Sequence, residues 1–294
     1  MEIEIPDVAL GQPAAAEMLA VWLVAGCCFA VSLAVAWLAL RRYRQGLPVV
    51  ERRPHDGVPW GGAEVAAAAL AFLGLQVLAA EMLPAEASLH ARLVAGSIAM
   101  LTATAVSVAH LWPRSKDWGV LGFGLGRLGD DLRLAVAGLG LMLAPLLGLA
   151  AVLDRVEPYR HAIVDFLTAH RDPVSIGLVM FAAVVAAPVA EEFLFRRVLQ
   201  GWLEAWFEPI EPAWGGRAAI VLSSLAFAAA HVGQGLAWVP LFFFGLVVGY
   251  LARQTGSIVP GIILHGLFNA VSVGLVLLQA AAPGEGGGGK ASPV

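Results

Sequence analysis

Residues 174–197 read VSIGLVMFAAVVAAPVAEEFLFRR, an apolar run that ends in two adjacent glutamates and two adjacent arginines. A helix needs about 20 mostly apolar residues to cross the hydrocarbon core of a bilayer, so this run predicts a membrane-spanning helix. Each ionisable side chain within such a span costs roughly 2.5–3.5 kcal/mol on insertion scales. Glu191 and Glu192 therefore indicate either a helix end at the lipid headgroups or a functional site inside the membrane.

Similar apolar runs occur along the whole chain of 294 residues. Hydrophobic residues make up 59% of it and charged residues only 14%, whereas a soluble domain is about 25% charged. The mean hydropathy is +0.79. We therefore predict an all-α, polytopic membrane helix bundle of about eight transmembrane helices, at residues 14–40, 61–83, 89–112, 132–153, 174–196, 217–232, 236–253 and 258–282.

The polar content of these spans divides the chain into three parts. Residues 1–170 hold four spans without a distinctive polar cluster, residues 171–282 form a helical core that holds the candidate site residues, and residues 283–294 form a Gly-rich tail that we expect to be disordered. The adjacent Cys27 and Cys28 form neither a CxxC pair nor a disulfide framework. No basic tail is present, so we expect no nucleic-acid partner. The apolar spans make the lipid bilayer the expected partner.

Basic residues are unequally distributed between the connections. If the N-terminus lies outside, the inner connections hold most of the 18 Lys and Arg residues, and the outer segments hold only Arg92, Arg155, Arg160, Arg171 and Lys290. Because Lys and Arg accumulate on the inner side of membrane proteins, we predict that both termini lie outside.

Two glycine patterns have structural interpretations. Gly124–Gly129 fits GxGxxG, but no strand precedes it and no βαβ unit surrounds it, so we interpret it as a connecting loop and not as a dinucleotide site. Gly245–Gly249 fits GxxxG within a span, where small residues let two helices approach closely.

The two glutamates are expected to have different partners. Adjacent helical residues point about 100° apart, so Glu191 and Glu192 cannot easily share one role. Glu192 and Arg196 are four residues apart and can pair on one face, while Glu191 faces away from Arg196. Pro188 removes a backbone donor one turn earlier, where we expect the helix to bend.

Further polar residues lie in two later spans. Phe227 and His231 share one face of the 217–232 span, and His265 and Asn269 share one face of the last span. Lipid offers such groups no partner, so they can meet the glutamates only inside the bundle. A buried polar cluster of this kind favours a functional site over a simple helix end.

At these residues the chain resembles the CPBP intramembrane proteases, which include the type II CAAX prenyl proteases and bacterial relatives tied to bacteriocin processing and self-immunity. The resemblance covers roughly residues 184–275 and rests on Glu191-Glu192-xxx-Arg196, Phe227-xxx-His231 and His265-xxx-Asn269, in that order. It implies an intramembrane endopeptidase of the bacterial inner membrane that cleaves membrane-associated or lipidated peptides or proteins. One departure is Arg197, where the family commonly has Gly.

The resemblance also implies a metal-independent glutamate mechanism. Glu191 would activate a water molecule as general base, with His231 holding that water. A carboxylate in a water-poor pocket is a stronger base than one in water. His265 and Asn269 would donate hydrogen bonds to the oxyanion. Glu192 would pair with Arg196 and fix the helix. The expected catalytic residues are therefore Glu191, Glu192, Arg196, His231, His265 and Asn269.

A second mechanism uses some of the same residues as metal ligands. Glu191, His231 and His265 would hold a divalent metal such as zinc with an open position for water. No HExxH motif is present, and the sequence does not decide between the two mechanisms, although no cofactor is favoured.

Two other functions use the same fold. The first alternative is a non-hydrolytic bacteriocin-immunity or membrane scaffold protein, and the second is a proton-coupled transporter. The complete set of buried polar groups favours the protease over the scaffold. The transporter ranks last, because neither an inverted repeat nor a pair of broken helices is visible in the sequence.

The predicted depths of the site residues conflict with one another. With straight helices in this topology, Glu191 and His265 lie toward the inner side and His231 lies toward the outer side. At a rise of about 1.5 Å per residue the offset exceeds roughly 10 Å, so one span boundary or the orientation must differ from this prediction.

Overall fold

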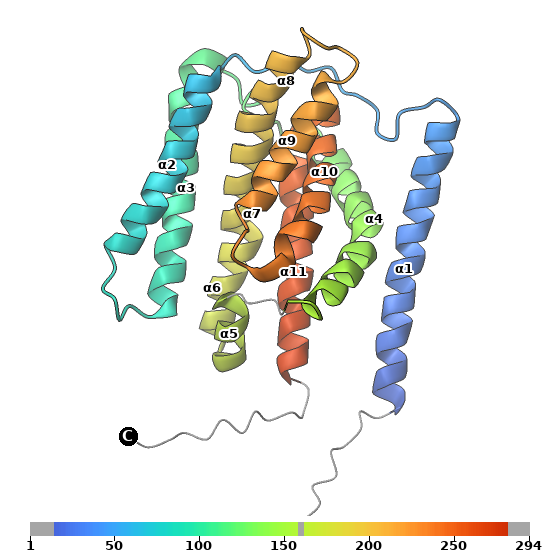
Figure 1. Cartoon of the computed structure of the whole chain (residues 1–294), viewed down its shortest axis with the longest axis vertical. Helices are drawn as coiled ribbons and strands as arrows, with labels where there is room; N and C mark the ends of the chain where they lie inside the picture. The colour runs from blue at the N-terminus through green and yellow to red at the C-terminus, as the bar shows by residue number, and fades with distance from the viewer. Residues whose placement is uncertain (1–14, 158–161, 282–294) are drawn as a thin grey trace, which may run out of the picture.

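The computed structural model describes residues 15–157 and 162–281, and every regular element in these ranges is a helix. The long helices run side by side in one bundle (Figure 1), which confirms the predicted all-α membrane fold. They are α1 (Ala15–Arg44), α2 (Gly62–Glu81), α3 (Leu89–Ser115), α4 (Leu128–Asp154), α10 (Trp238–Thr255) and α11 (Val259–Ala281). The short α5 (Ala162–Ala169), which the sequence did not predict, precedes the glutamate-bearing helix.

One continuous helix of 35 residues carries the glutamate pair. Its parts are α6 (Pro173–Met180), the π-helical η1 (Phe181–Ala186), α7 (Ala187–Glu191), the π-helical η2 (Glu192–Gln200) and α8 (Gly201–Phe207). The predicted end of this span at residue 196 is therefore wrong. The helix continues because Leu203 is buried and Trp202 packs against the core cluster that contains Trp60.

The segment predicted as a span at 217–232 forms a shorter helix, α9 (Gly215–Ala229), of 15 residues. Fifteen residues extend roughly 22 Å, less than the roughly 30 Å hydrocarbon core. Seven helices of the described chain are long and apolar enough to cross a membrane, so α9 is the eighth, partial element. Gly233 and Gly235 follow it with φ angles of 109° and 62°, which let the chain turn back through the 3-10 helix η3 (Gly235–Ala237) into α10.

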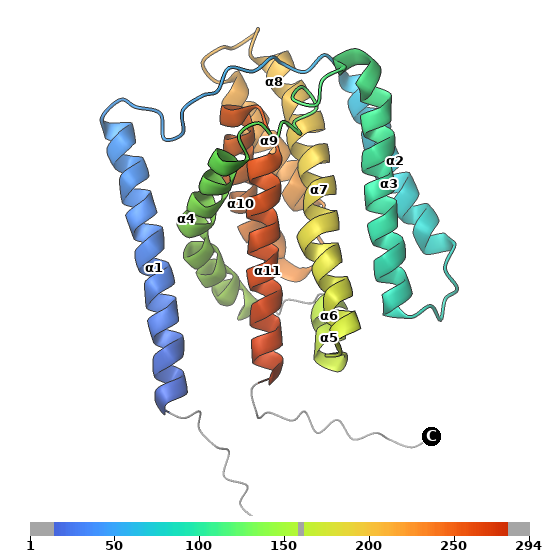
Figure 2. The same cartoon turned by 180° about the vertical axis from the view of Figure 1, so that it is seen from behind.

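Helix α11 lies in the middle of the bundle, where it packs on α4, α10 and η1 (Figure 2). The α2–α3 hairpin lies on one side, and α1 packs on α4 at the other, where the Ser32 hydroxyl donates to the Gly140 carbonyl at 2.7 Å. Helices α9 and α10 approach closely at Gly245, where an added Cβ would lie 2.9 Å from Ser224 Cβ. This close approach agrees with the interpretation of the GxxxG pattern.

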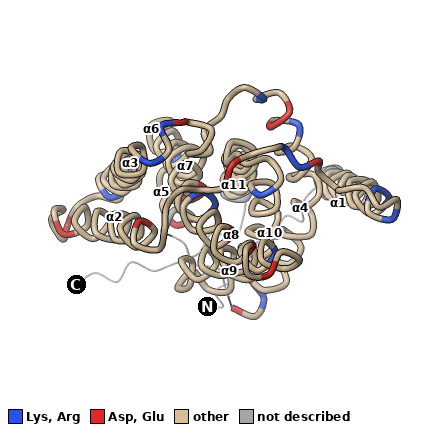
Figure 3. Tube along the Cα trace, turned by 90° about the horizontal axis from the view of Figure 1, so that it is seen from above, with Lys and Arg blue, Asp and Glu red and all other residues tan. Residues whose placement is uncertain are grey.

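The start of α1 and the end of α11 lie at the same end of the bundle (Figures 1 and 2). This arrangement agrees with the prediction that both termini lie on one side of the membrane. That this side is the outer one stays a prediction. The opposite end carries the connections 45–61, 116–127 and 208–214, and a view onto it shows charged residues along these connections and at helix ends (Figure 3). The tail predicted at residues 283–294 lies outside the described residues.

Candidate active site

One π-helical segment, η1, lies before the glutamate pair, and a second, η2, begins at Glu192. Pro188 lies just after η1 and has no N–H, so it donates to neither Val184 nor Ala183, the residues four and five positions earlier. The wider π turn accommodates the proline, and the helix continues through Glu191. Such turns within α-helices are frequent at functional sites.

Helix α11 fills the space beside this turn. The Asn269 side chain donates a 2.7 Å hydrogen bond from Nδ2 to the Ala183 carbonyl. At Gly266 an added Cβ would lie 2.8 Å from the Val184 carbonyl oxygen, so only glycine permits this approach. Asn269 and Gly266 therefore hold α11 against η1 at the level of His265. The sequence did not predict this holding role for Asn269, which uses one of its two amide hydrogens.

We expect Gly266→Ala to reduce stability by about 1–3 kcal/mol, because the methyl group must displace α11 from η1. Gly274→Ala is the matched control on the same helix, since no heavy atom lies within 4 Å of the Cβ it would add. Thermal unfolding of the purified protein in detergent measures both. Equal unfolding temperatures for the two variants would contradict the close contact.

His265 lies between the two glutamates. Its Nδ1 is 3.0 Å from Oε1 of Glu192, and its Nε2 is 3.9 Å from Oε2 of Glu191. The Glu192 side chain is fully buried, whereas that of Glu191 is 18% exposed. A carboxylate only accepts, so Nδ1 donates to an ionised Glu192 and leaves Nε2 directed at Glu191. At 3.9 Å, Nε2 of His265 and Oε2 of Glu191 are too far apart for a direct hydrogen bond.

Arg196 neutralises the buried Glu192, as the four-residue spacing predicted. Its Nε lies 3.4 Å from Glu192 Oε2, and both side chains are completely buried. The guanidinium lies over the Phe227 ring, 5.0 Å from its centroid, and Nη1 donates to Ser223 at 3.3 Å. A buried ion pair of this kind is costly to break, because the remaining charge has no solvent.

His231 reaches the same region from the end of α9. Its Nδ1 donates to the Phe227 carbonyl at 2.9 Å, which leaves Nε2 of the neutral ring free to accept a proton. The Phe227 ring centroid lies 4.9 Å from that of His231 and 5.9 Å from that of His265. The predicted offset in depth between His231 and the other site residues rested on a straight helix that crosses the whole membrane. That assumption is wrong, because α9 ends inside the bundle (Figure 1).

This part of the chain matches a known family. Residues 173–271, from the start of α6 into α11, match the family model described as type II CAAX prenyl endopeptidase Rce1-like. The chain carries an Rce1-like domain. No curated protein and no solved structure matches the chain. The match confirms the resemblance drawn from the three motifs, and a domain of this kind implies a peptidase.

The Rce1-like domain also contains polar residues that sequence reasoning missed. Gln200 donates to Glu204 at 2.9 Å and to the Gly249 carbonyl at 2.8 Å, and it accepts from Ser223 at 3.1 Å. Glu204 lies 3.7 Å from Arg253 on α10. A polar chain thus extends from the ion pair of Glu192 to the end of the bundle. Its signal in the sequence is a polar residue at every fourth position from Glu192 to Glu204.

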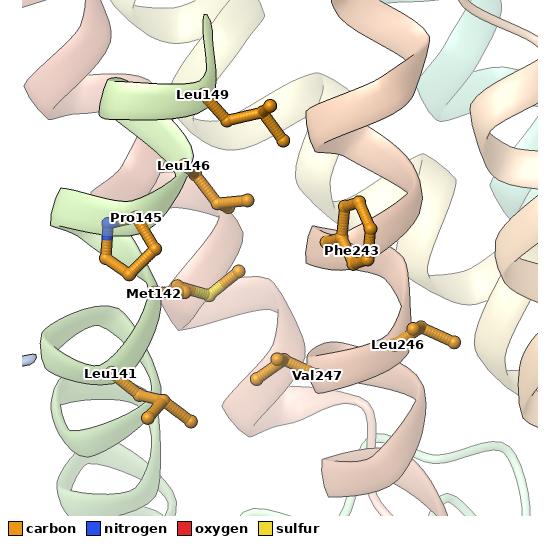
Figure 4. Close-up of a pocket in the computed structure, with 8 residues that line it drawn as sticks. All are labelled: Leu141, Met142, Pro145, Leu146, Leu149, Phe243, Leu246 and Val247. Carbon is orange, nitrogen blue, oxygen red and sulfur yellow. The ribbon is translucent and has the colours of Figure 1, made fainter. Parts of the chain in front are cut away.

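An apolar cavity of about 420 Å³ lies beside the Rce1-like domain, between α4 and α10 (Figure 4). It is lined by Leu141, Met142, Pro145, Leu146, Leu149, Phe243, Leu246 and Val247. Met142 and Leu146 belong to the same core cluster as Phe244, whose ring lies 4.9 Å from that of His265. The cavity and the ring of His265 therefore border the same hydrophobic core cluster.

The predicted metal ligands do not form a metal site in the part of the chain that the structure describes. No group of three His, Cys, Asp or Glu side chains is arranged there to hold a metal ion. Nδ1 of His231 and Nδ1 of His265 are both used in hydrogen bonds within the protein. That pattern is usual for metal-ligating histidines, which bind the metal through Nε2, so these bonds do not exclude zinc, and only the separation of the three side chains departs from a three-ligand centre.

Proposed function

We propose that the chain is an intramembrane endopeptidase that hydrolyses peptide bonds of membrane-associated or lipidated substrates. The observation that carries the proposal is the position of His265, between a buried, arginine-paired glutamate and a second, partly exposed one. Two adjacent carboxylates thereby have different environments, so one can position the histidine while the other reacts.

In the proposed reaction Glu191 takes a proton from water, whose oxygen forms a bond to the peptide carbonyl carbon. Oε2 of Glu191 and Nε2 of His265, 3.9 Å apart, would both contact that water or the carbonyl oxygen from one side. His231, whose ring packs on Phe227 next to His265, would orient the water through Nε2. As the C–N bond breaks, the proton on Glu191 passes to the leaving nitrogen.

The oxyanion of the tetrahedral intermediate needs hydrogen-bond donors. We assign this role to Nε2 of His265, which donates when the ring carries a proton on both nitrogens, and to the second amide hydrogen of Asn269, which the bond to Ala183 leaves free. Glu192 and Arg196 make no contact with substrate in this scheme. They fix the ring of His265 and balance the buried charge.

The experiment that tests the function is cleavage of a fluorogenic lipidated peptide by the purified protein in liposomes. We expect hydrolysis that persists after treatment with a metal chelator, because the scheme routes no step through a metal. Absence of cleavage from a panel of lipidated and unmodified peptides would favour the scaffold alternative. Loss of cleavage on chelation, with recovery on adding zinc, would favour the metal mechanism.

We further propose that the α4–α10 cavity holds the lipid chain of the substrate. Its lining is apolar, and it borders the core cluster whose Phe244 ring lies 4.9 Å from that of His265. We expect Val247→Trp to fill it and to raise KM for a lipidated peptide roughly tenfold, the effect of losing about two buried methylene groups. KM for the same peptide without lipid should stay unchanged. Leu225→Trp, at an exposed position on α9, is the control, and equal effects of both variants would contradict the assignment.

A further inference from the structure

A second cavity, of about 340 Å³ and lined by polar groups, lies at one end of the bundle. This is the end opposite the start of α1 and the end of α11 (Figure 1). Three segments form its walls: residues 53–56, the 117–127 loop, and Thr255–Ser257 between α10 and α11. Backbone hydrogen bonds join these segments, from Arg53 N–H to the Gln254 carbonyl at 2.7 Å and from Ile258 N–H to the Gly122 carbonyl at 3.0 Å. The cavity is therefore part of the folded bundle.

Arg197 brings a buried positive charge to this cavity. The residue is only 7% exposed, its Nε donates to the Val120 carbonyl, and its guanidinium lies over the Trp60 ring at 5.6 Å. Among the described residues no carboxylate lies within the 4.0 Å ion-pair distance of it. The charge of Glu204 acts on Arg197 from beyond ion-pair distance, but Glu204 itself accepts from Gln200 and is paired with Arg253. A buried cation without a directly paired carboxylate is unfavourable, and an anion in the cavity would supply a direct partner.

Other groups around the cavity can also donate to an anion. Gly124 and Gly126 line it, and within the described chain their backbone N–H groups have no hydrogen-bond acceptor. Arg127 lines it as well and is exposed, with no ion-pair partner among the described residues. Glycines in such a loop let backbone donors approach an anion closely.

The remaining charged residues of the wall do not cancel this charge. Arg53 is neutralised by Asp131 at 2.5 Å. Asp56 and Asp117 line the cavity but are exposed, so water screens them, and Asp117 accepts from the Gly119 N–H at 2.5 Å. His55 bonds to the Arg253 carbonyl through Nε2 at 3.0 Å. The buried charge of the cavity is therefore that of Arg197.

The cavity and the proposed catalytic site lie on different sides of the same helix. The guanidinium of Arg196 lies over Phe227 on the catalytic side, whereas that of Arg197 lies over Trp60. A peptide whose scissile bond is at Glu191 would therefore not reach Arg197 with the same segment.

The end of a membrane-spanning bundle lies at the depth of the lipid headgroups. Arginine forks and free backbone N–H groups are typical ligands of phosphate oxygens.

We propose that this cavity binds a phosphate group, carried by the headgroup of an anionic phospholipid, with Arg197 as its buried anchor and Arg127 and the Gly124–Gly126 backbone as further donors. The bound headgroup would fix the 117–127 loop on the start of α11, the helix that carries His265. The site is separate from the proposed peptidase reaction and does not depend on it.

The test uses the full-length protein in neutral detergent. Its thermal unfolding is followed while short-chain phosphatidylglycerol, short-chain phosphatidylcholine, glycerol 1-phosphate or inorganic phosphate is added at constant ionic strength. We expect phosphatidylglycerol to raise the unfolding temperature at the lowest concentration. Equal potency of phosphatidylglycerol and inorganic phosphate would assign the site to free phosphate. No stabilisation by any of the three anionic compounds would overturn the proposal.

Variants separate this site from general charge attraction. We expect Arg197→Gln to weaken binding of phosphatidylglycerol roughly tenfold or more, which is the effect of losing a charged hydrogen bond, and Arg197→Lys to restore part of it. If Arg197→Gln does not fold, Arg127→Gln tests the same site from an exposed position. Arg133→Gln removes an equal charge outside the cavity, where Arg133 pairs with Asp130. The proposal fails if Arg133→Gln weakens binding as much as Arg127→Gln, or if the Arg197 variants weaken only peptide binding.

Discussion

Glu191→Gln should abolish peptide hydrolysis and leave the fold intact. The amide keeps the size of the carboxylate but cannot take a proton from water, so kcat should fall by roughly 10²–10⁴-fold, the usual contribution of a general base. The side chain of Glu191 is 18% exposed and makes no ion pair with arginine, so its loss of charge should change the unfolding temperature little. The measurement is kcat on a lipidated peptide in liposomes, together with thermal unfolding of the same preparation.

Two control variants make this result specific. Glu211→Gln changes an exposed carboxylate in the connection between α8 and α9 and should leave kcat unchanged. Glu192→Gln changes the adjacent residue and should reduce stability as well as activity, because Arg196 loses its counter-charge. A Glu191→Gln enzyme with more than a tenth of the normal kcat would exclude Glu191 as the base.

The three sequence motifs, at Glu191–Arg196, Phe227–His231 and His265–Asn269, predicted which polar side chains meet better than they predicted the contacts between them. The spacing of Glu192 and Arg196 implied their ion pair, and the structure has it at 3.4 Å. The position of His265 between both glutamates was not predictable, because it depends on how α11 packs against a π-helical turn. That turn follows from Pro188, whose missing N–H the sequence shows, but several helix geometries can accommodate one proline.

The length of α9 shows a second limit. Its sequence is as apolar as that of a complete span, because hydropathy counts apolar residues whether they face lipid or the bundle. Buried Phe227, Ser223 and Ser224 face inward, and the glycines after the helix mark the turn only once its position is known. The extension of the preceding helix to residue 207 was missed for the opposite reason, since the charged Arg196 and Arg197 resembled a helix end at the headgroups, yet both are buried.

Gln200 and Ser223 were missed because single polar residues in apolar helices usually bond to their own backbone. Here their side chains bond to each other and connect Arg196 to Glu204. Polar side chains repeated at four-residue spacing in one span are therefore more informative than any of them alone. Because Arg196 connects this network to the buried Glu192, we expect Arg196 to be the residue of the site that is most important for stability.

Arg196→Met should destabilise the protein by about 3–5 kcal/mol, the largest stability effect expected in this chain. Methionine fills much of the space of the arginine stem over Phe227, but it leaves the fully buried Glu192 without a counter-charge. The measurement is the free energy of unfolding in detergent. Arg133→Met, which breaks the exposed pair with Asp130, is the control and should cost less than about 1 kcal/mol.

The double variant Glu192→Gln/Arg196→Met distinguishes lost charge pairing from lost packing. Removing both charges leaves no unpaired ion, and the amide oxygen introduced by Glu192→Gln can still accept from His265 Nδ1. We expect the double variant to be more stable than Arg196→Met alone, since a neutral replacement of a buried ion pair is often tolerated. If the double variant is no more stable than Arg196→Met, packing over Phe227 is the main contribution of Arg196. Recovery of stability without recovery of hydrolysis would show that the ion pair fixes His265 for the reaction as well as holding the helices together.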